Sequence, residues 1–309
     1  MWKLTGGRAH VTDPTNASRT LLWSLASRDW DPELLALFDV PRALLPDVVP
    51  SSGPVGEAWL QGAQVPIAGI AGDQQAALFG QGCTERGQAK VTYGTGSFLL
   101  VNDGERLDPP PHGLVRTAAA QPGTTALEGS VFVSGAALQW LRDGLGLLAS
   151  AAQSEHMAAA VPDNGGVHFV PALTGLGSPW WDPAARGVIS GLTRGTGREH
   201  LVRAALEAIA YQVRDVVEAI PGGVSALRAD GGAAANPWLM QFQADMLGLP
   251  VEVAPEREMT AIGAAALAAG HPPSRAPGAV YEPSISRDQA DALYRDWLAA
   301  VQRARTTRF

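Results

Sequence analysis

The stretch from Gly69 to Gly96 constrains the fold of this chain more than any other. The apolar run Val65–Gly72 ends in glycines and predicts a buried strand that stops abruptly, and Asp73 then opens a short helix over 76–81. In α/β folds ligands bind at the carboxyl edge of the strands, so the Asp73 carboxylate can face a substrate there. Asp is also a common helix cap, and the residues alone leave both interpretations open.

A glycine hairpin completes this stretch. The segments Ala89–Tyr93 and Ser97–Asn102 are strand-like and are joined by Gly94-Thr95-Gly96. A turn of this composition exposes backbone amides and one hydroxyl that can approach a phosphate closely. The alternative is an ordinary hairpin without a ligand.

The composition excludes several classes of function. The chain has 309 residues, 46% of them hydrophobic, a formal charge of -7 and only two lysines, which argues against a nucleic-acid or anionic-membrane surface. The apolar runs are too short or too glycine-rich to span a bilayer, and no signal segment opens the chain. The single cysteine, Cys83, excludes an internal disulfide and fits a reducing compartment. We expect a globular cytoplasmic protein.

Helices are expected on both sides of the central stretch. The Asp13-Pro14 pair predicts a helix to about Ser27, and Asp31-Pro32 predicts another. Further on, Arg198–Ile220 has an apolar stripe with Arg/Glu pairs beside it, and this pattern is typical of a structural helix. The loop over 174–187 holds paired tryptophans, which more often pack than bind a ligand.

Two further segments place polar groups and glycines where a ligand can approach. After a strand at Thr125–Val133, a helix over Gly135–Leu147 carries Gly135 and Gln139 one turn apart, either facing a ligand or packed and solvated. A strand over 226–229 ends in Asp230-Gly231-Gly232, and a helix starts near Asn236. Strand, glycine turn and helix in this order suit a nucleotide, although a glycine pair alone is weak evidence. The histidines lack metal-ligand spacing, and neither a Ser/His/Asp set nor a lysine-bearing P-loop is present.

Five motifs in one order carry a family resemblance. They are GIAGDQQAALFGQ, YGTGSF, ALEGSVFVSGAALQWLRD, PALTGLGSPWWDPAARG and DGGAAANPWLMQFQAD. Together they resemble the FGGY carbohydrate kinase family, and within it the glycerol kinases, over the range from Thr15 almost to Gly270. The GDQQ motif points to glycerol more than to a pentose or gluconate.

The resemblance implies a fold and a set of site residues. The fold would be α/β, with two actin-like, ribonuclease-H-like domains that close on MgATP and glycerol; residues 1–82 would be a remnant of the first domain and 83–309 the nucleotide-binding second domain. Asp73 would be the catalytic base, with a water-mediated contact to Mg²⁺, and Gln74 would contact glycerol. The binding site for the nucleotide, ATP or ADP, would be lined by Gly94, Thr95, Gly135, Gln139, Gly232 and Asn236.

The chain departs from the family pattern in two places. The family's opening phosphate-binding hairpin and glycerol clamp have no counterpart, so we expect an incomplete first domain and no measurable glycerol phosphorylation by this chain alone. We expect it to associate with a partner, either a complementary N-terminal chain or further copies in a homo-oligomer. The segment from Glu57 to Pro66 lacks the glycine-rich loop that binds an allosteric sugar bisphosphate in some relatives. Two alternatives stay open: another sugar kinase of the same family, or a non-catalytic fragment that binds nucleotide.

Overall fold

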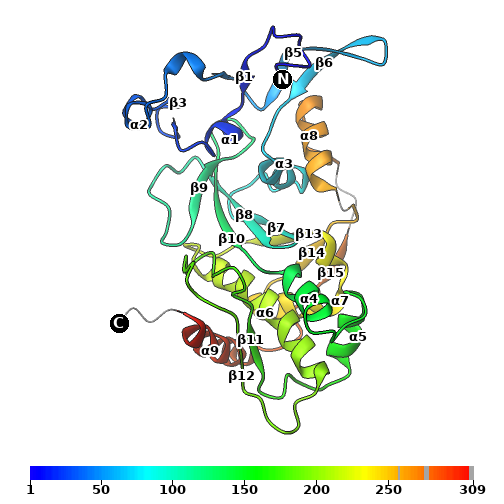
Figure 1. Ribbon diagram of the computed structural model, residues 1–309. Helices are drawn as coiled ribbons and strands as arrows, with labels where there is room; N and C mark the ends of the chain where they lie inside the picture. Colours follow the sequence, from blue (N-terminus) through cyan, green and yellow to red (C-terminus); the bar gives the residue numbers. More distant parts are fainter. Residues whose placement is uncertain (257, 275–277, 306–309) are drawn as a thin grey trace.

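A mixed sheet of seven strands forms the centre of the molecule (Figure 1). The computed structural model describes residues 1–309 except 257, 275–277 and 306–309. The strands of this sheet, in spatial order, are β15 (Ala279–Tyr281), β14 (Val251–Val253), β13 (Ala226–Asp230), β7 (Gln88–Tyr93), β8 (Ser97–Gly104), β10 (Thr125–Val131) and β9 (Val115–Ala118).

The strand register brings three turns to one edge of this sheet. β7 pairs antiparallel with β8, and Tyr93 lies opposite Ser97; β10 pairs antiparallel with β8, and Val131 also lies opposite Ser97. β13 runs parallel to β7, and its last residue, Asp230, pairs with Thr92. The hairpin after β7, the turn after β10 and the glycine pair after β13 therefore meet at one place, as expected for a ligand edge.

Helices cover both faces of the sheet. On β7 the alternating residues Ala89, Val91 and Tyr93 belong to the main core, which includes α6 (Arg198–Glu218), whereas Lys90 points to the opposite face. That opposite face packs on α3 (Asp73–Gly80), in a smaller cluster with Leu100. In Figure 1 the two helices lie on opposite sides of the sheet.

The second half contains several further helices, most of which pack on α6. They are α4 (Gly135–Asp143), α5 (Gln153–Ala159), η2 (Gly232–Ala235), α7 (Pro237–Leu247), α8 (Met259–Ala269) and α9 (Arg287–Ala304), with a two-stranded sheet of β11 (His168–Val170) and β12 (Val188–Ser190). The predicted helix over Arg198–Ile220 is confirmed. Its charged side is covered as well, because Arg203 also donates to carbonyls next to α5 and Arg214 to the Ala290 carbonyl on α9.

A buried carboxylate on α6 joins three elements. Asp215 accepts hydrogen bonds from Tyr294 Oη (2.6 Å) and from the Trp297 indole on α9 (3.1 Å). Trp180, from the loop with paired tryptophans, donates its indole N–H to the same carboxylate at 3.2 Å. Trp180 therefore packs, and the neighbouring Trp181, although 45% exposed, packs edge-on against Phe132 and donates its indole N–H to the Gly113 carbonyl at 2.8 Å. Burial raises the pKa of Asp215 to about 6, although these hydrogen bonds oppose the shift.

We expect this raised pKa to produce a measurable pH dependence of stability. The folded protein holds a proton on Asp215 up to about pH 6, whereas the unfolded chain loses it near pH 3.8. The stabilising contribution is thus complete below about pH 4 and is lost as the pH rises to 6, by an amount on the order of 3 kcal/mol. Urea unfolding at pH 4 to 7 measures it, with Asp215→Asn as the comparison. Parallel pH profiles of the two proteins would contradict the assignment.

The first 72 residues contain short elements. They are β1 (Val11–Thr12), α1 (Pro14–Ala17), β2 (Trp23–Ser24), β3 (Asp29–Trp30), α2 (Pro32–Leu37), η1 (Arg42–Leu44), β4 (Asp47–Val48), β5 (Ser52–Leu60) and β6 (Ala63–Gly69). The segment from Glu57 to Pro66 lies in the β5–β6 hairpin, whose turn residues Gln61 and Gly62 both have positive φ.

The expected helix from Pro14 to about Ser27 is wrong beyond Ala17. The hydroxyls of Ser18 and Thr20 donate to the carbonyls three residues earlier, and such side chains compete with helix hydrogen bonds. Leu21 has a φ of 62°, which turns the chain out of the helix and into the β2–β3 hairpin. The helix begun at Asp31-Pro32 is confirmed as α2.

α8 lies with the first part of the chain although it follows the central sheet in sequence. It packs on α3 and on β5 and β6 (Figure 1). The helices approach through glycines: a Cβ at Gly80 would lie 2.3 Å from the Met259 carbonyl oxygen, and one at Gly263 would lie 1.8 Å from the Ala76 oxygen. Among the described residues, no helix has the length and apolar character needed to cross a membrane.

Candidate active site

Asp73 is exposed at the first turn of α3. The N-cap position belongs to Gly72, so the interpretation of Asp73 as the N-cap is wrong. Asp73 Oδ1 accepts the Gln74 backbone N–H at 2.8 Å, and Oδ2 accepts the Gln74 side-chain amide at 3.3 Å. Each oxygen of this exposed carboxylate accepts one hydrogen bond, so the carboxylate can accept a further donor. Asp73 and Gln74 thus present one polar pair at the start of α3.

A buried carboxylate that the sequence analysis missed holds the turn before Asp73. Asp13 is fully buried and accepts hydrogen bonds from Thr15 Oγ1 (2.6 Å), Ser51 Oγ (2.7 Å) and two backbone amides of α1. Thr15 Oγ1 in turn accepts the Gly72 N–H at 2.7 Å. This chain of hydrogen bonds links the backbone next to Asp73 to the buried Asp13 carboxylate.

Lys90 is the second group that the sequence analysis missed. This fully buried residue of β7 donates its ammonium to Gln74 Oε1 and, at 2.9 Å, to Thr92 Oγ1. The first bond fixes the Gln74 amide so that its NH₂ group faces Asp73. Burial lowers the pKa of Lys90 to about 8, opposed by the charges of Asp230, Glu128 and Asp73. In the sequence, Lys90 could have been recognised because it stands between apolar core residues of a predicted strand.

One cavity of about 470 Å³ lies at the sheet edge where the three turns meet. All six residues expected at a nucleotide site line it: Gly94, Thr95, Gly135, Gln139, Gly232 and Asn236. The hairpin and α4 are joined directly, because the Gly135 N–H donates to the Gly94 carbonyl (3.0 Å) and the Ala136 N–H to the Thr95 carbonyl (3.1 Å). The structure therefore brings together residues that are far apart in the sequence.

The glycines at this edge differ in what they contact. A Cβ at Gly135 would lie 2.6 Å from the Gly94 carbonyl oxygen, so Gly135 allows close packing as well as lining the cavity. Gly231 has a φ of 88°, and its Cβ would lie 2.5 Å from the Tyr93 carbonyl oxygen. Gly232 has open space where its Cβ would lie. Gly231 is thus required by the fold, whereas the fold leaves room for a side chain at Gly232.

Two polar residues of the cavity differ in their hydrogen bonding. Asn236 is the N-cap of α7: its Oδ1 accepts the Leu239 N–H at 3.1 Å, and its Nδ2 donates to Ser154 Oγ at 3.2 Å. Gln139 on α4 makes no side-chain hydrogen bond within the described part of the chain. Gln139 is therefore the more available partner for a ligand.

The described residues contain no group of three or more His, Cys, Asp or Glu side chains that could hold a metal ion. Mg²⁺ is usually bound by one or two carboxylates together with substrate phosphates. Asp73 offers such a carboxylate. The residues present thus fit a magnesium ion that arrives with a nucleotide.

Comparison with known proteins identifies the class to which the chain belongs. The model of the FGGY family of carbohydrate kinases, C-terminal domain, matches residues 89–270, and that of the N-terminal domain matches residues 1–80. The chain belongs to this family.

The relatives include several glycerol kinases. The chain is 54% identical to the glycerol kinase of Dechloromonas aromatica (strain RCB) and 52% identical to glycerol kinase 2 of Thermotoga maritima, in each case over 98% of the chain. The solved structure of Plasmodium falciparum glycerol kinase with ADP matches with a TM-score of 0.90 at 33% identity, and that of xylulose kinase from Rhodospirillum rubrum with 0.84 at 27%. Each match covers 98% of the chain and 65% of the solved one. The chain spans 64% and 65% of the length of the two curated relatives.

These matches confirm the family and the α/β kinase fold. They do not support the expectation of an incomplete first domain, because the N-terminal family model matches within the chain. The boundary at 82/83 and the roles of the individual site residues stay predictions.

Proposed function

We propose that the chain provides the nucleotide site and catalytic carboxylate of an ATP-dependent kinase that phosphorylates glycerol to glycerol 3-phosphate. The observation that carries this proposal is the convergence of all six expected nucleotide-site residues on one cavity. The high identity to glycerol kinases favours glycerol over other substrates.

The proposed reaction is a direct phosphoryl transfer. An oxygen–phosphorus bond forms between a terminal hydroxyl of glycerol and the γ-phosphorus of ATP, and the bond from that phosphorus to the oxygen bridging the β- and γ-phosphates breaks, which releases ADP. The hydroxyl proton passes to Asp73, whose exposed carboxylate is the acceptor that this step requires. Gln74, fixed by Lys90, orients glycerol beside Asp73. The Gly94–Gly96 hairpin binds the phosphates. Asp73 would hold Mg²⁺ through water, and the ion would supply positive charge to the phosphates.

A substrate panel tests this proposal. The measurement is ADP release with glycerol, xylulose or gluconate, first from the chain and then from the chain extended with the part of the Dechloromonas aromatica relative that it does not cover. We expect glycerol to give the highest kcat/KM. Faster turnover with another polyol would identify a different sugar kinase. ADP binding without turnover in both proteins would favour a nucleotide-binding fragment.

Gly232→Val is expected to weaken ADP binding at least about tenfold without unfolding the protein. The added side chain enters open space on the cavity wall, so it meets the nucleotide and not the protein. Calorimetric titration with ADP measures the affinity, and thermal unfolding checks the fold. Gly231→Val is the matched comparison, because its side chain would collide with the Tyr93 backbone and destabilise the protein. Unchanged ADP affinity in folded Gly232→Val would reject the site.

We also propose that residues 1–82 form the substrate side and that residues 83–309 bind the nucleotide, with α8 packed against the first part. A cytoplasmic location, which the single cysteine favours, belongs to this proposal. The partners are glycerol and adenine nucleotide.

A further inference from the structure

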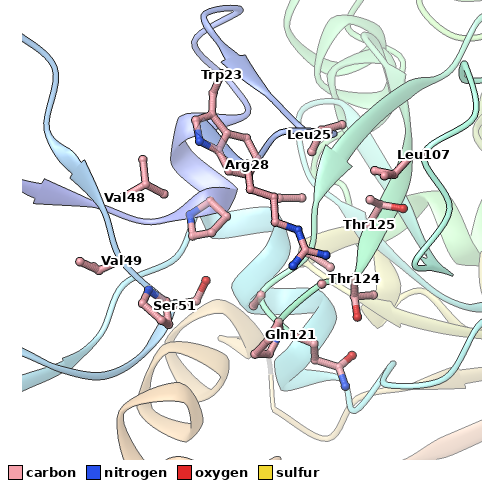
Figure 2. A pocket seen from close by; sticks show the side chains of 17 residues that line it. Trp23, Leu25, Arg28, Val48, Val49, Ser51, Leu107, Gln121, Thr124 and Thr125 are labelled. Carbon is pink, nitrogen blue, oxygen red and sulfur yellow. The ribbon is translucent and has the colours of Figure 1, made fainter. Parts of the chain in front are cut away.

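A second cavity lies apart from the nucleotide cavity, between the β2–β3 hairpin and the loop that joins β9 to β10. Its volume is about 230 Å³, and Figure 2 shows the side chains that line it. The strand register separates the two cavities: Thr125, in the wall of this one, pairs with Gly104, whereas the nucleotide edge is at the Ser97–Val131 end of the same strands. Six or seven residues of strand correspond to about 20 Å.

The first sign of a ligand is a buried donor without an acceptor. Trp23 is 8% exposed and lines the cavity, and its indole N–H has no hydrogen-bond partner in the protein. Its strand partner Trp30 donates its own indole N–H to the Pro46 carbonyl at 2.9 Å. A buried N–H left unpaired costs about 1–3 kcal/mol, so an acceptor that enters the cavity would gain this bond.

The second sign is a cation without a carboxylate. Arg28 lines the cavity, and its guanidinium makes no ion pair or hydrogen bond within the described chain; Figure 2 shows it among the lining side chains. Its Nη2 lies 3.2 Å from the point where a Cβ would stand at Gly123, so this glycine leaves room for the guanidinium. Glu105 Oε1 lies 3.8 Å from the same point but forms no ion pair with Arg28.

The third polar group is also a donor. Gln121 Oε1 already accepts from Asn102 Nδ2 at 3.2 Å, while the Gln121 NH₂ group has no partner in the described protein. Most of the remaining wall is apolar, with Leu25, Val48 and Leu107 facing the space. Three free donors, one of them cationic, and apolar walls select a ligand that has an anionic acceptor group and an apolar body.

We propose that this cavity binds a small carboxylate with an apolar body, whose carboxylate is held by Arg28 and the Trp23 indole N–H. A planar carboxylate matches the fork of guanidinium donors better than a spherical anion does. The inference concerns a site outside the proposed phosphoryl-transfer site and stands whether or not the chain is a kinase.

Titration of the chain with benzoate tests this proposal. The readout is the indole N–H resonance of Trp23 in a ¹⁵N-correlated NMR spectrum, identified by its loss in Trp23→Phe. We expect a saturable shift of this resonance with benzoate, little or no shift with benzamide, and weaker binding of inorganic phosphate. No saturable shift with benzoate would overturn the proposal. Equal binding of benzamide, or tighter binding of phosphate, would overturn the chemical class.

Substitutions at the charged positions separate a built site from general surface attraction. Arg28 has a φ of 55°, and Asn tolerates this conformation, so Arg28→Asn removes the charge with little effect on folding. We expect it to weaken benzoate binding at least about tenfold, whereas Glu105→Gln, which removes the nearby competing carboxylate, strengthens it. Arg194→Asn, at an exposed arginine elsewhere, is the control. Equal affinity of Arg28→Asn and the control would overturn the role of Arg28.

Discussion

Asp73→Asn is expected to lower kcat for glycerol phosphorylation by about 100- to 10,000-fold, the usual contribution of a general base. Asn keeps the shape of the side chain and can still accept the Gln74 N–H, but its amide cannot take the proton of the attacking hydroxyl. ADP affinity is expected to stay the same, because Asp73 is not among the residues that line the nucleotide cavity.

The measurement is steady-state ADP release in whichever form of the protein phosphorylates glycerol, together with calorimetric ADP binding. Asp39→Asn is the control: Asp39 is exposed, its φ of 54° suits Asn equally well, and it lies outside the proposed site. Near-normal turnover of folded Asp73→Asn would reject Asp73 as the base. Equal losses in both variants would indicate a general effect of removing a surface charge.

The sequence predicts those parts of the fold that depend on local patterns. The β7–β8 hairpin and α6 occur at or within two residues of the expected bounds, and α2 begins at the expected Asp31-Pro32 pair, because alternation, prolines and apolar stripes act over a few residues. The expected helix to Ser27 ends at Ala17, where the Ser18 and Thr20 hydroxyls bond to backbone carbonyls and Ser18 also bonds to Thr117, about a hundred residues away. Such a tertiary contact has no local signal.

The candidate site likewise contains residues that the sequence predicts and residues that it does not. Motif resemblance supplied Asp73, Gln74 and the six residues of the nucleotide cavity. The groups that hold Asp73 in place were missed, because Asp13 looks like an ordinary helix cap and Lys90 like an isolated charge in a strand. Their roles depend on contacts with Ser51 and Gln74, which only the folded chain brings close to them.

Lys90→Met is expected to lower the free energy of unfolding by about 3–5 kcal/mol, the usual cost of removing one partner from a buried group of charges. In this variant the Glu128 carboxylate still has a cation beside it, because Arg19 binds it through two hydrogen bonds of 2.9 and 3.0 Å. Asp230 is only 4% exposed, and its Oδ1 has no hydrogen-bond partner in the described protein. The Asp230 carboxylate therefore depends on the charge of Lys90 more than the carboxylates of Glu128 and Asp73 do.

Urea unfolding at pH 7 measures this loss. Lys3→Met is the matched control, since Lys3 is exposed and is the only other lysine of the chain. The double variant Lys90→Met/Asp230→Asn gives the coupling: if Lys90 acts through the Asp230 carboxylate, the double variant is more stable than the sum of the two single losses predicts. Additive losses would show instead that Lys90 stabilises the protein through Gln74 and Thr92. In that case the same substitution would free the Gln74 amide, and KM for glycerol would rise.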